Sequence, residues 1–167
     1  MIRPLRLFPD PLLNTPAEPV ARFTPQTRKL IQDLLDTLAV SPGVGLAAPQ
    51  IGVLERVAVI DVSRDRRRKP RPGSNHGLLI LINPEILSAE GSQTPREGCL
   101  SVPDLLADVR RSGSVRFRSR DEAGREQIFE VEGFEALAVQ HEVDHLNGKL
   151  FLDRVANVKT NLFRRQI

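Results

Sequence analysis

The sequence has very few of the side chains that bind transition metals or stack on nucleic-acid bases. Among its 167 residues are one cysteine, three histidines, seven phenylalanines, no tryptophan and no tyrosine. A single cysteine excludes an intramolecular disulfide and fits a reducing cytoplasm, where such a thiol is a catalyst, a ligand or inert filler. The shortage of aromatic rings argues against an RNA-binding surface built on base stacking.

Long apolar runs are also missing. No stretch approaches 18 apolar residues, and Arg3 and Pro4 interrupt the first residues too early for the apolar core of a signal peptide. With 40% hydrophobic and 27% charged residues, the chain can bury one sizeable core. We therefore expect a cytoplasmic protein without a membrane anchor, organised as one catalytic domain over residues 1–167.

The scarce histidines fall in a pattern typical of metal hydrolases. His141 and His145 stand four residues apart, so on a helix both rings can reach one ion, whereas Glu142 lies about 100° further round the helix and suits proton transfer better than ligation. The alternative is two ordinary core histidines. The apolar stripe that would turn both inward comprises Phe134, Leu137, Ala138, His141 and His145.

The remaining patterns predict an α+β domain. Thr24 can cap a helix that has Pro25 in its first turn and ends at residues 41–43. Strands are expected at 57–62, 78–82, 86–90, 115–119 and 127–131, with a turn at 121–124 and a loop from 43 onwards. We expect small antiparallel or mixed β-sheets around a central helix that carries the two histidines.

Three segments together resemble the peptide deformylase family. They read Gly-Val-Gly-Leu-Ala-Ala-Pro-Gln at 43–50, Glu-Gly-Cys-Leu-Ser at 97–101 and Gln-His-Glu-Val-Asp-His-Leu-Asn-Gly at 140–148. Each matches the family pattern at every fixed position, and the similarity extends over about residues 3 to 155. The resemblance implies hydrolysis of the N-terminal formyl group of nascent polypeptides that begin with formyl-methionine, with release of formate.

The resemblance also implies roles for individual residues. Cys99 joins His141 and His145 as the third ligand of one divalent metal, which the resemblance makes Fe²⁺ in the cell, although the ligands also suit Zn²⁺, Ni²⁺ or Co²⁺. Glu142 carries the proton, while the Gln50 side chain and the Leu100 backbone N–H stabilise the oxyanion. Glu97 pairs with Arg111, and Gln140 and Asp144 are supporting polar residues, of which Asp144 could orient a ligand histidine.

Position in the sequence indicates where the peptide would bind. Val44, Leu137 and Ala138 are candidates for an apolar slot that takes the methionine side chain, although plain core packing would also explain the last two. An extended peptide could add as a strand beside residues 43–45 and 96–98, which include Gly45, Glu97 and Gly98.

Two features depart from the best-known family pattern. A basic run at 64–71 opens a loop that continues to residue 77, and it is either a solvated hairpin tip or a contact for ribosomal RNA phosphates. His76 belongs to this loop and is excluded from the metal site. The second feature is a short tail from residue 154. Relatives are thought to dock on the ribosome through a longer C-terminal helix, so that docking is in doubt here. We expect the protein to be a monomer.

Two other functions remain open on the sequence alone. A zinc endopeptidase of the His-Glu-x-x-His type usually takes its third ligand downstream of the helix, where only Asp153 is near. A basic RNA-binding module with a structural metal would use the 64–71 run, but a net charge of +3 is a weak electrostatic footprint. Formate release and internal peptide cleavage distinguish the three functions.

Overall fold

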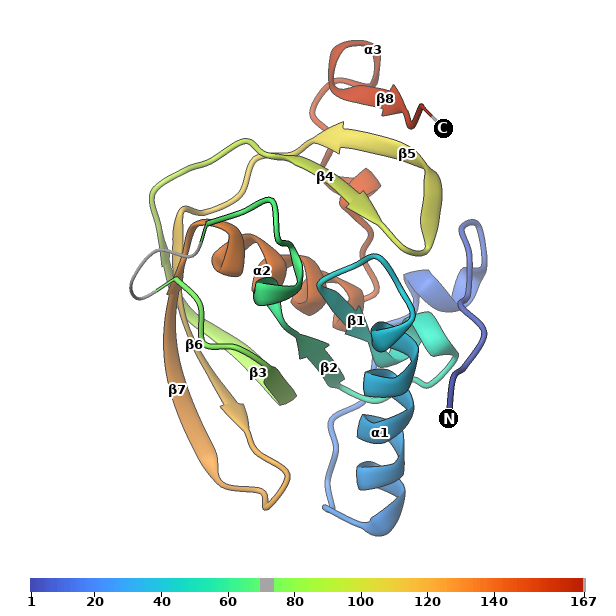
Figure 1. Ribbon diagram of the computed structural model, residues 1–167, viewed down its shortest axis with the longest axis vertical. Coiled ribbons are helices and arrows are strands. Elements are labelled where there is room, and N and C mark those ends of the chain that lie inside the picture. The colour runs from blue at the N-terminus through green and yellow to red at the C-terminus, as the bar shows by residue number, and fades with distance from the viewer. Residues whose placement is uncertain (70–73, 167) are drawn as a thin grey trace.

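Two antiparallel sheets enclose a helix at the centre of the molecule (Figure 1). The computed structural model describes residues 1–69 and 74–166. Its helices are α1 (Pro25–Ala39), α2 (Gly133–Leu146) and α3 (Val158–Asn161), and its strands are β1 (Gly45–Ala47), β2 (Val57–Ile60), β3 (Leu79–Glu90), β4 (Arg96–Cys99), β5 (Val102–Asp108), β6 (Ser114–Arg120), β7 (Glu126–Glu132) and β8 (Leu162–Arg164). Short 3-10 helices span Pro11–Asn14, Ala48–Ile51, Val62–Arg64 and Phe151–Arg154.

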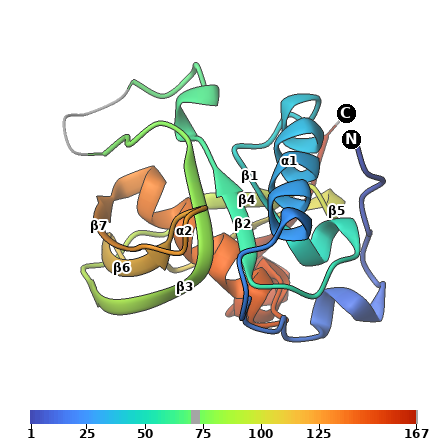
Figure 2. The ribbon, with the colours of Figure 1, turned by 90° about the horizontal axis from the view of Figure 1, so that it is seen from below.

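The larger sheet has the strand order β1-β2-β3-β6-β7, and the smaller has the order β4-β5-β8. Because side chains alternate across a strand, β2 serves two cores. Ala58 and Ile60 pack with α2, whereas Val57 and Val59 pack with α1. The two helices therefore cover opposite faces of β2, with α1 beside β1 and β2 in Figure 2.

The N-terminal helix begins where the sequence predicts. The Thr24 backbone N–H donates to Oγ1 of Thr27 (3.3 Å), and Pro25 occupies the first helical position. Leu30, Leu34 and Leu38 are buried along one side, as the helical spacing requires. This helix fixes the start of the segment that leads into β1.

The central helix is buried on more than the predicted stripe. Eleven of the fourteen residues of α2 are buried, including Glu142 and Asp144 as well as both histidines. The helix ends in a Schellman motif, in which the Lys149 N–H donates to the Asp144 carbonyl (2.9 Å) and the Gly148 N–H to that of His145 (3.1 Å). Gly148 has φ 74°, and a Cβ there would press on the backbone of residues 14–16.

Residues 79–90 form one strand where the sequence predicts two. Strand β3 continues through a register shift between Ile82 and Glu85. Asn83 has φ 51°, and its side chain is bonded to both the N–H (2.8 Å) and the C=O (2.9 Å) of Val20. Asn tolerates this backbone conformation, so the Asn-Pro pair makes a bulge within one strand instead of a break.

The predicted loop after residue 43 is also wrong in part. Residues 45–47 form β1, which pairs with β2 in the register Gly45↔Ile60, and Ala48–Ile51 is a 3-10 helix. Strands β4, β5 and β8 were not predicted either. These strands are short or contain glycine and proline, so they have no alternating pattern of their own and depend on pairing with distant residues.

The chain after residue 154 adds a strand to the smaller sheet. Strand β8 pairs antiparallel with β5, with Phe163 opposite Leu106.

In the described part of the chain, no helix combines the length and apolar character needed to cross a bilayer.

Candidate active site

Three side chains from distant parts of the sequence meet beside α2. Cys99 at the end of β4 lies next to His141 and His145 of α2, with all of their ligand atoms within 4.8 Å of one another. The Cys99 Sγ and His145 Nε2 atoms are 3.3 Å apart, and all three residues are buried. Sulfur and imidazole nitrogen are donors that suit divalent transition metals.

Local geometry explains how each ligand reaches the cluster. The helical spacing of four residues brings the rings of His141 and His145 to a centroid separation of 4.9 Å. The β4–β5 register shifts between Gly98, opposite Leu106, and Cys99, opposite Val102. Cys99 lies two residues after Glu97, so side-chain alternation turns both of them towards α2.

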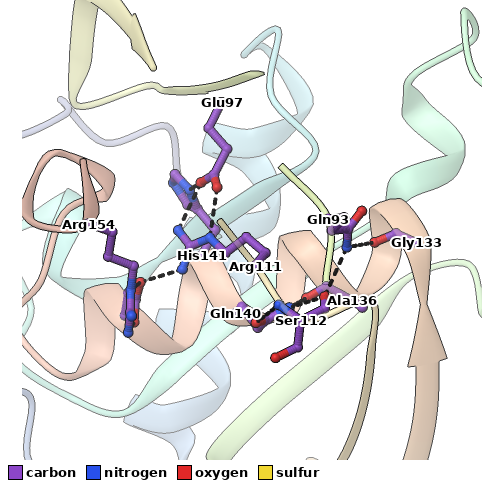
Figure 3. Close-up of polar contacts among 10 residues, drawn as sticks. Gln93, Glu97, Arg111, Ser112, Gly133, Ala136, Gln140, His141 and Arg154 are labelled. Atoms are coloured by element: carbon purple, nitrogen blue, oxygen red, sulfur yellow. Dashed lines mark hydrogen bonds and ion pairs between the residues drawn. The ribbon is translucent and has the colours of Figure 1, made fainter. Parts of the chain in front are cut away.

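Glu97 fixes the orientation of one ligand histidine (Figure 3). The His141 Nδ1 atom is 2.8 Å from Oε1 of Glu97, which leaves Nε2 of the ring for a metal. Arg111 donates two further hydrogen bonds to Glu97, at 2.7 and 2.9 Å, as the predicted pairing of these residues requires. Burial alone would raise the pKa of Glu97, but these bonds outweigh it and lower the pKa to about 2.

These contacts restrict how Glu97 could bind a substrate. Both oxygens of its carboxylate accept hydrogen bonds from Arg111 or His141, and the side chain is 1% exposed. The side chain is therefore not available to a substrate, and only the backbone of Glu97 could bind a peptide.

Asp144 binds the same arginine as Glu97, through a different nitrogen of the Arg111 guanidinium. It accepts hydrogen bonds from Arg111 (2.6 Å) and from Arg154 (2.5 and 2.7 Å), and it contacts neither ligand histidine. Asp144 therefore acts on a histidine only indirectly, because it positions Arg111, which holds Glu97, and Glu97 bonds to His141. Arg154 gave no sequence signal, because only the fold brings it to Asp144.

The network makes a stability prediction. We expect Arg111→Met to lower the free energy of unfolding by about 3–5 kcal/mol, because Glu97 and Asp144 would remain buried without their shared cation. Part of the wild-type advantage is present above about pH 4.5 and is lost as the pH falls towards 2, because the folded-state pKa of Glu97 is lowered from 4.5 to about 2. Urea unfolding at neutral and acid pH measures both effects.

Arg118 provides the matched control. It forms an exposed ion pair with Glu85 at 2.7 Å, so Arg118→Met should change the unfolding free energy by only about 0–1 kcal/mol. Equal losses in the two variants would contradict a supporting role for the buried network.

Glu142 faces the cluster with a free carboxylate oxygen. The side chain is buried, and its Oε2 atom has no hydrogen-bond partner among the described residues. Burial raises the pKa of Glu142 to about 7, which suits a group that gains and loses a proton near neutral pH. Across from it lies Gly45, where a Cβ would overlap Oε1 of Glu142.

The two histidines of the cluster differ in their preferred charge. Burial lowers the pKa of His145 well below its ordinary value, so the ring is neutral, as a metal ligand must be. Burial also opposes the charged form of His141, but hydrogen bonds with Cys99 and Glu97 outweigh it and raise the pKa. A divalent cation would reverse this preference, because its charge repels a proton on the ligand nitrogen.

Gln50 is held beside the sulfur ligand. Its Oε1 atom accepts from the Ala47 N–H (2.9 Å), while Nε2 lies 3.6 Å from Cys99 Sγ and 3.1 Å from Ser101 Oγ. The carbonyl end is thereby fixed, and the amide donor points at the cluster. Ser101 is fully buried and supports Gln50, a role that the sequence did not assign.

Leu100 and Gly43 bring segments 97–101 and 43–50 into contact. A Cβ on Gly43 would lie 3.0 Å from Leu100 Cδ1, so the loop before β1 rests on the Leu100 side chain. The chain segments 43–45 and 97–101 therefore border the same cluster from two sides.

The residues expected around a methionine side chain are buried or half-buried. Val44 and Ala138 belong to one apolar cluster, which Phe134 also contacts, and Leu137 is buried. Ala138 packs in the hydrophobic core, which is the alternative that the sequence left open for this residue. A cavity of about 530 Å³ adjoins Phe134, with Arg68 and Lys69 among its lining residues, but Val44, Leu137 and Ala138 do not line it.

The described basic residues of the loop are exposed, as expected for a solvated loop, and two of its arginines also contact the rest of the protein. Arg64 donates to the backbone carbonyls of Leu38 (2.8 Å), Ser41 (3.0 Å) and Gly43 (3.2 Å), and it thereby braces the segment that enters β1. Arg68 lies over the Phe134 ring at 3.8 Å. Residues 70–73 of the predicted loop lie outside the described residues.

His76 is separate from the metal ligands, as the sequence predicts. Its backbone N–H donates to Oε2 of Glu135 (2.8 Å), and its Nδ1 atom is 2.5 Å from Oε1 of the same residue. Glu135 is fully buried in the first turn of α2. His76 therefore ties the end of the loop to the helix.

The donor set fits a divalent metal ion. Two imidazoles and one thiolate leave a fourth position open, and the unpartnered Oε2 of Glu142 lies in the same buried region. The fold and this cluster define a metal-dependent hydrolase built on a His-Glu-x-x-His helix. More particularly, the chain belongs to the polypeptide deformylase family, whose pattern matches residues 2–161.

Relatives and solved structures agree with this assignment. A peptide deformylase from Alkalilimnicola ehrlichii is 45% identical over 161 residues, which is 96% of this chain and 86% of the relative. Peptide deformylase 1 of Bacillus subtilis is 45% identical over 91% of this chain and 89% of its own. The crystal structure of a peptide deformylase from Legionella pneumophila superposes with a TM-score of 0.85 and 40% identity, covering 95% of this chain and 89% of that one.

Proposed function

We propose that this protein removes the formyl group from formyl-methionine at the start of nascent polypeptides and releases formate. The observation that carries the proposal is the buried Cys99, His141 and His145 cluster with the unpartnered carboxylate oxygen of Glu142 beside it. Membership of the polypeptide deformylase family supports the same reaction. The activity belongs to a single catalytic domain.

Cys99, His141 and His145 would hold one divalent ion. A bound ion supplies Lewis acidity, which lowers the pKa of water to about 7 and polarises a carbonyl. Fe²⁺ is the metal we propose for the cell, with Zn²⁺, Ni²⁺ and Co²⁺ as ions that the same ligands accept. Anaerobic purification with elemental analysis and parallel activity measurement identifies the native ion.

The chain's own groups divide the remaining work. Glu142 takes a proton from the attacking water and returns it to the leaving amine, for which a pKa of about 7 is well placed. The Gln50 amide and the Leu100 N–H stabilise the formyl oxygen as it gains negative charge. Ser101 and Ala47 fix Gln50, so its donor is oriented before the substrate arrives.

Two strand edges offer the peptide a place to bind. Strand β1 ends the order of the larger sheet and β4 ends that of the smaller, so each has one edge without a partner strand in the described residues. A peptide between them would extend along the backbone of Gly45, Glu97 and Gly98. We propose that its methionine side chain lies against Val44, Leu137 and Ala138, of which Val44 and Ala138 share one apolar cluster and Leu137 is buried.

Formyl-Met-Ala-Ser tests the reaction directly. We expect formate release with intact peptide bonds, and much slower reaction of acetyl-Met-Ala-Ser, because the extra methyl must enter a space bounded by the metal ligands, Gln50 and Leu100. Formate assay and mass spectrometry on the same samples measure both products. Internal cleavage would support the endopeptidase instead, and no reaction of the iron-loaded protein would support a non-catalytic module.

The proposal places the protein in the cytoplasm, as a monomer close to emerging chains. Arg66 and Arg67 are exposed and could face ribosomal RNA phosphates, whereas Arg64 is already bonded to three backbone carbonyls. Co-sedimentation of wild type and Arg66→Ser/Arg67→Ser with ribosomes, at low and high salt, tests this contact.

A further inference from the structure

An arginine from the end of the smaller sheet lies on the strand proposed to bind the peptide. Arg165 follows β8, and its backbone N–H donates to the Asp104 carbonyl of β5 (2.9 Å). A Cβ on Gly98 would overlap Nη2 of Arg165 and lie 2.8 Å from Leu106 Cδ2. The missing side chain of Gly98 is thus the space that the guanidinium occupies.

Charged side chains of the neighbouring strands pair with each other and not with Arg165. The neighbouring Phe163 ring lies under the Arg96 guanidinium at 3.9 Å, and Arg96 forms two hydrogen bonds with Asp108, at 3.0 and 3.3 Å. Arg165 is exposed, and within residues 1–69 and 74–166 no acidic side chain pairs with it. The outer face of β4 therefore presents one uncompensated cation.

Side-chain alternation relates this cation to the substrate. The Glu97 and Cys99 side chains contact His141 and His145 on the inner face, so Gly98 faces outward with Arg165. In an extended peptide beside β4, a methionine side chain directed inward puts the next side chain on the outer face. The second residue of the substrate would then lie near Arg165 and Leu106.

We infer that Arg165 is a specificity-determining residue that favours an acidic side chain directly after formyl-methionine. The inference rests on the proposed function and on strand-like binding at β4. A carboxylate at that position would pair with the guanidinium, whereas a lysine would be repelled by it. The pair forms in the bound substrate before the chemical step, so it changes KM more than kcat.

The test compares formyl-Met-Glu-Ser-amide with formyl-Met-Lys-Ser-amide through the ratio of their kcat/KM values. At low salt we expect Arg165→Ala to lower the Glu/Lys ratio by about 2- to 5-fold, as for an exposed ion pair, with a larger fall in Arg165→Glu. The change should come from KM and should shrink in 0.5 M salt. Arg164→Ala is the matched control, because residue 164 points to the other face of β8 and should leave the ratio unchanged.

Three outcomes separate the inference from the proposed function. An unchanged ratio in Arg165→Glu, or an equal fall in Arg164→Ala, overturns the inference while leaving deformylation intact. Wild-type protein that releases no formate from either peptide or from formyl-Met-Ala-Ser overturns the proposed function as well. Formate release with a ratio that depends on residue 165 and not on residue 164 supports the inference, and thermal unfolding confirms that each variant is folded.

Discussion

Glu142→Gln is expected to lower kcat by about 10²- to 10⁴-fold, the usual contribution of a positioned proton carrier. Glutamine fills the same buried space beside Gly45 but cannot take up and return a proton. Because Oε2 of Glu142 has no hydrogen-bond partner in the described structure, the substitution breaks no bond at that atom. The metal ligands are untouched, so metal content should stay at one ion per chain.

Formate release under saturating substrate, together with elemental analysis, measures this effect. Glu135→Gln is the control, because Glu135 is also buried in α2 but is paired with His76 away from the cluster. Its kcat should stay close to that of the wild type. Near-normal turnover in Glu142→Gln would show that another group carries the proton.

Cys99→Ala should remove both the metal and the activity. The two histidines alone provide only two of the three protein ligands, and the thiolate is the anionic member of the set. We expect metal content to fall to a small fraction of one ion per chain, with formate release at the level of the metal-free protein. Anaerobic dialysis followed by elemental analysis measures the loss, and unfolding in the presence and absence of metal shows whether binding still stabilises the fold.

Ser101→Ala distinguishes ligand loss from general damage to this region. Ser101 is as deeply buried and bonds Gln50, but it is not among the cluster's ligands. This variant should retain its metal. Full metal occupancy in Cys99→Ala would mean that the third ligand is a different residue.

The two catalytic variants fail for different reasons, and that contrast tests the site as a unit. Glu142→Gln should be metal-loaded and inactive, whereas Cys99→Ala should be metal-poor and inactive. If both lost metal, Glu142 would be part of the ligand set and not a proton carrier. If both kept it, the cluster of Cys99, His141 and His145 would not be the metal site.

Local patterns in the sequence determined the central part of the site. The spacing of His141 and His145 depends only on the helical repeat, and the resemblance of residues 97–101 to the family pattern implied Cys99 as the third ligand. The start of α1 at Thr24 and the glycine that ends α2 are equally local, because caps involve residues within one turn.

Only the tertiary structure decided which groups support those ligands. Glu97 binds His141 across 44 residues of sequence and Arg111 binds Asp144 across 33, and Arg154 completes the network. Three further features also depend on contacts between distant residues. They are the bulge in strand β3, the hydrogen bonds from Arg64 to residues 38–43 and the position of Arg165 on Gly98. Contacts between distant residues leave no periodic trace in the sequence, because they arise from how sheets and helices pack and not from the repeat of any one element.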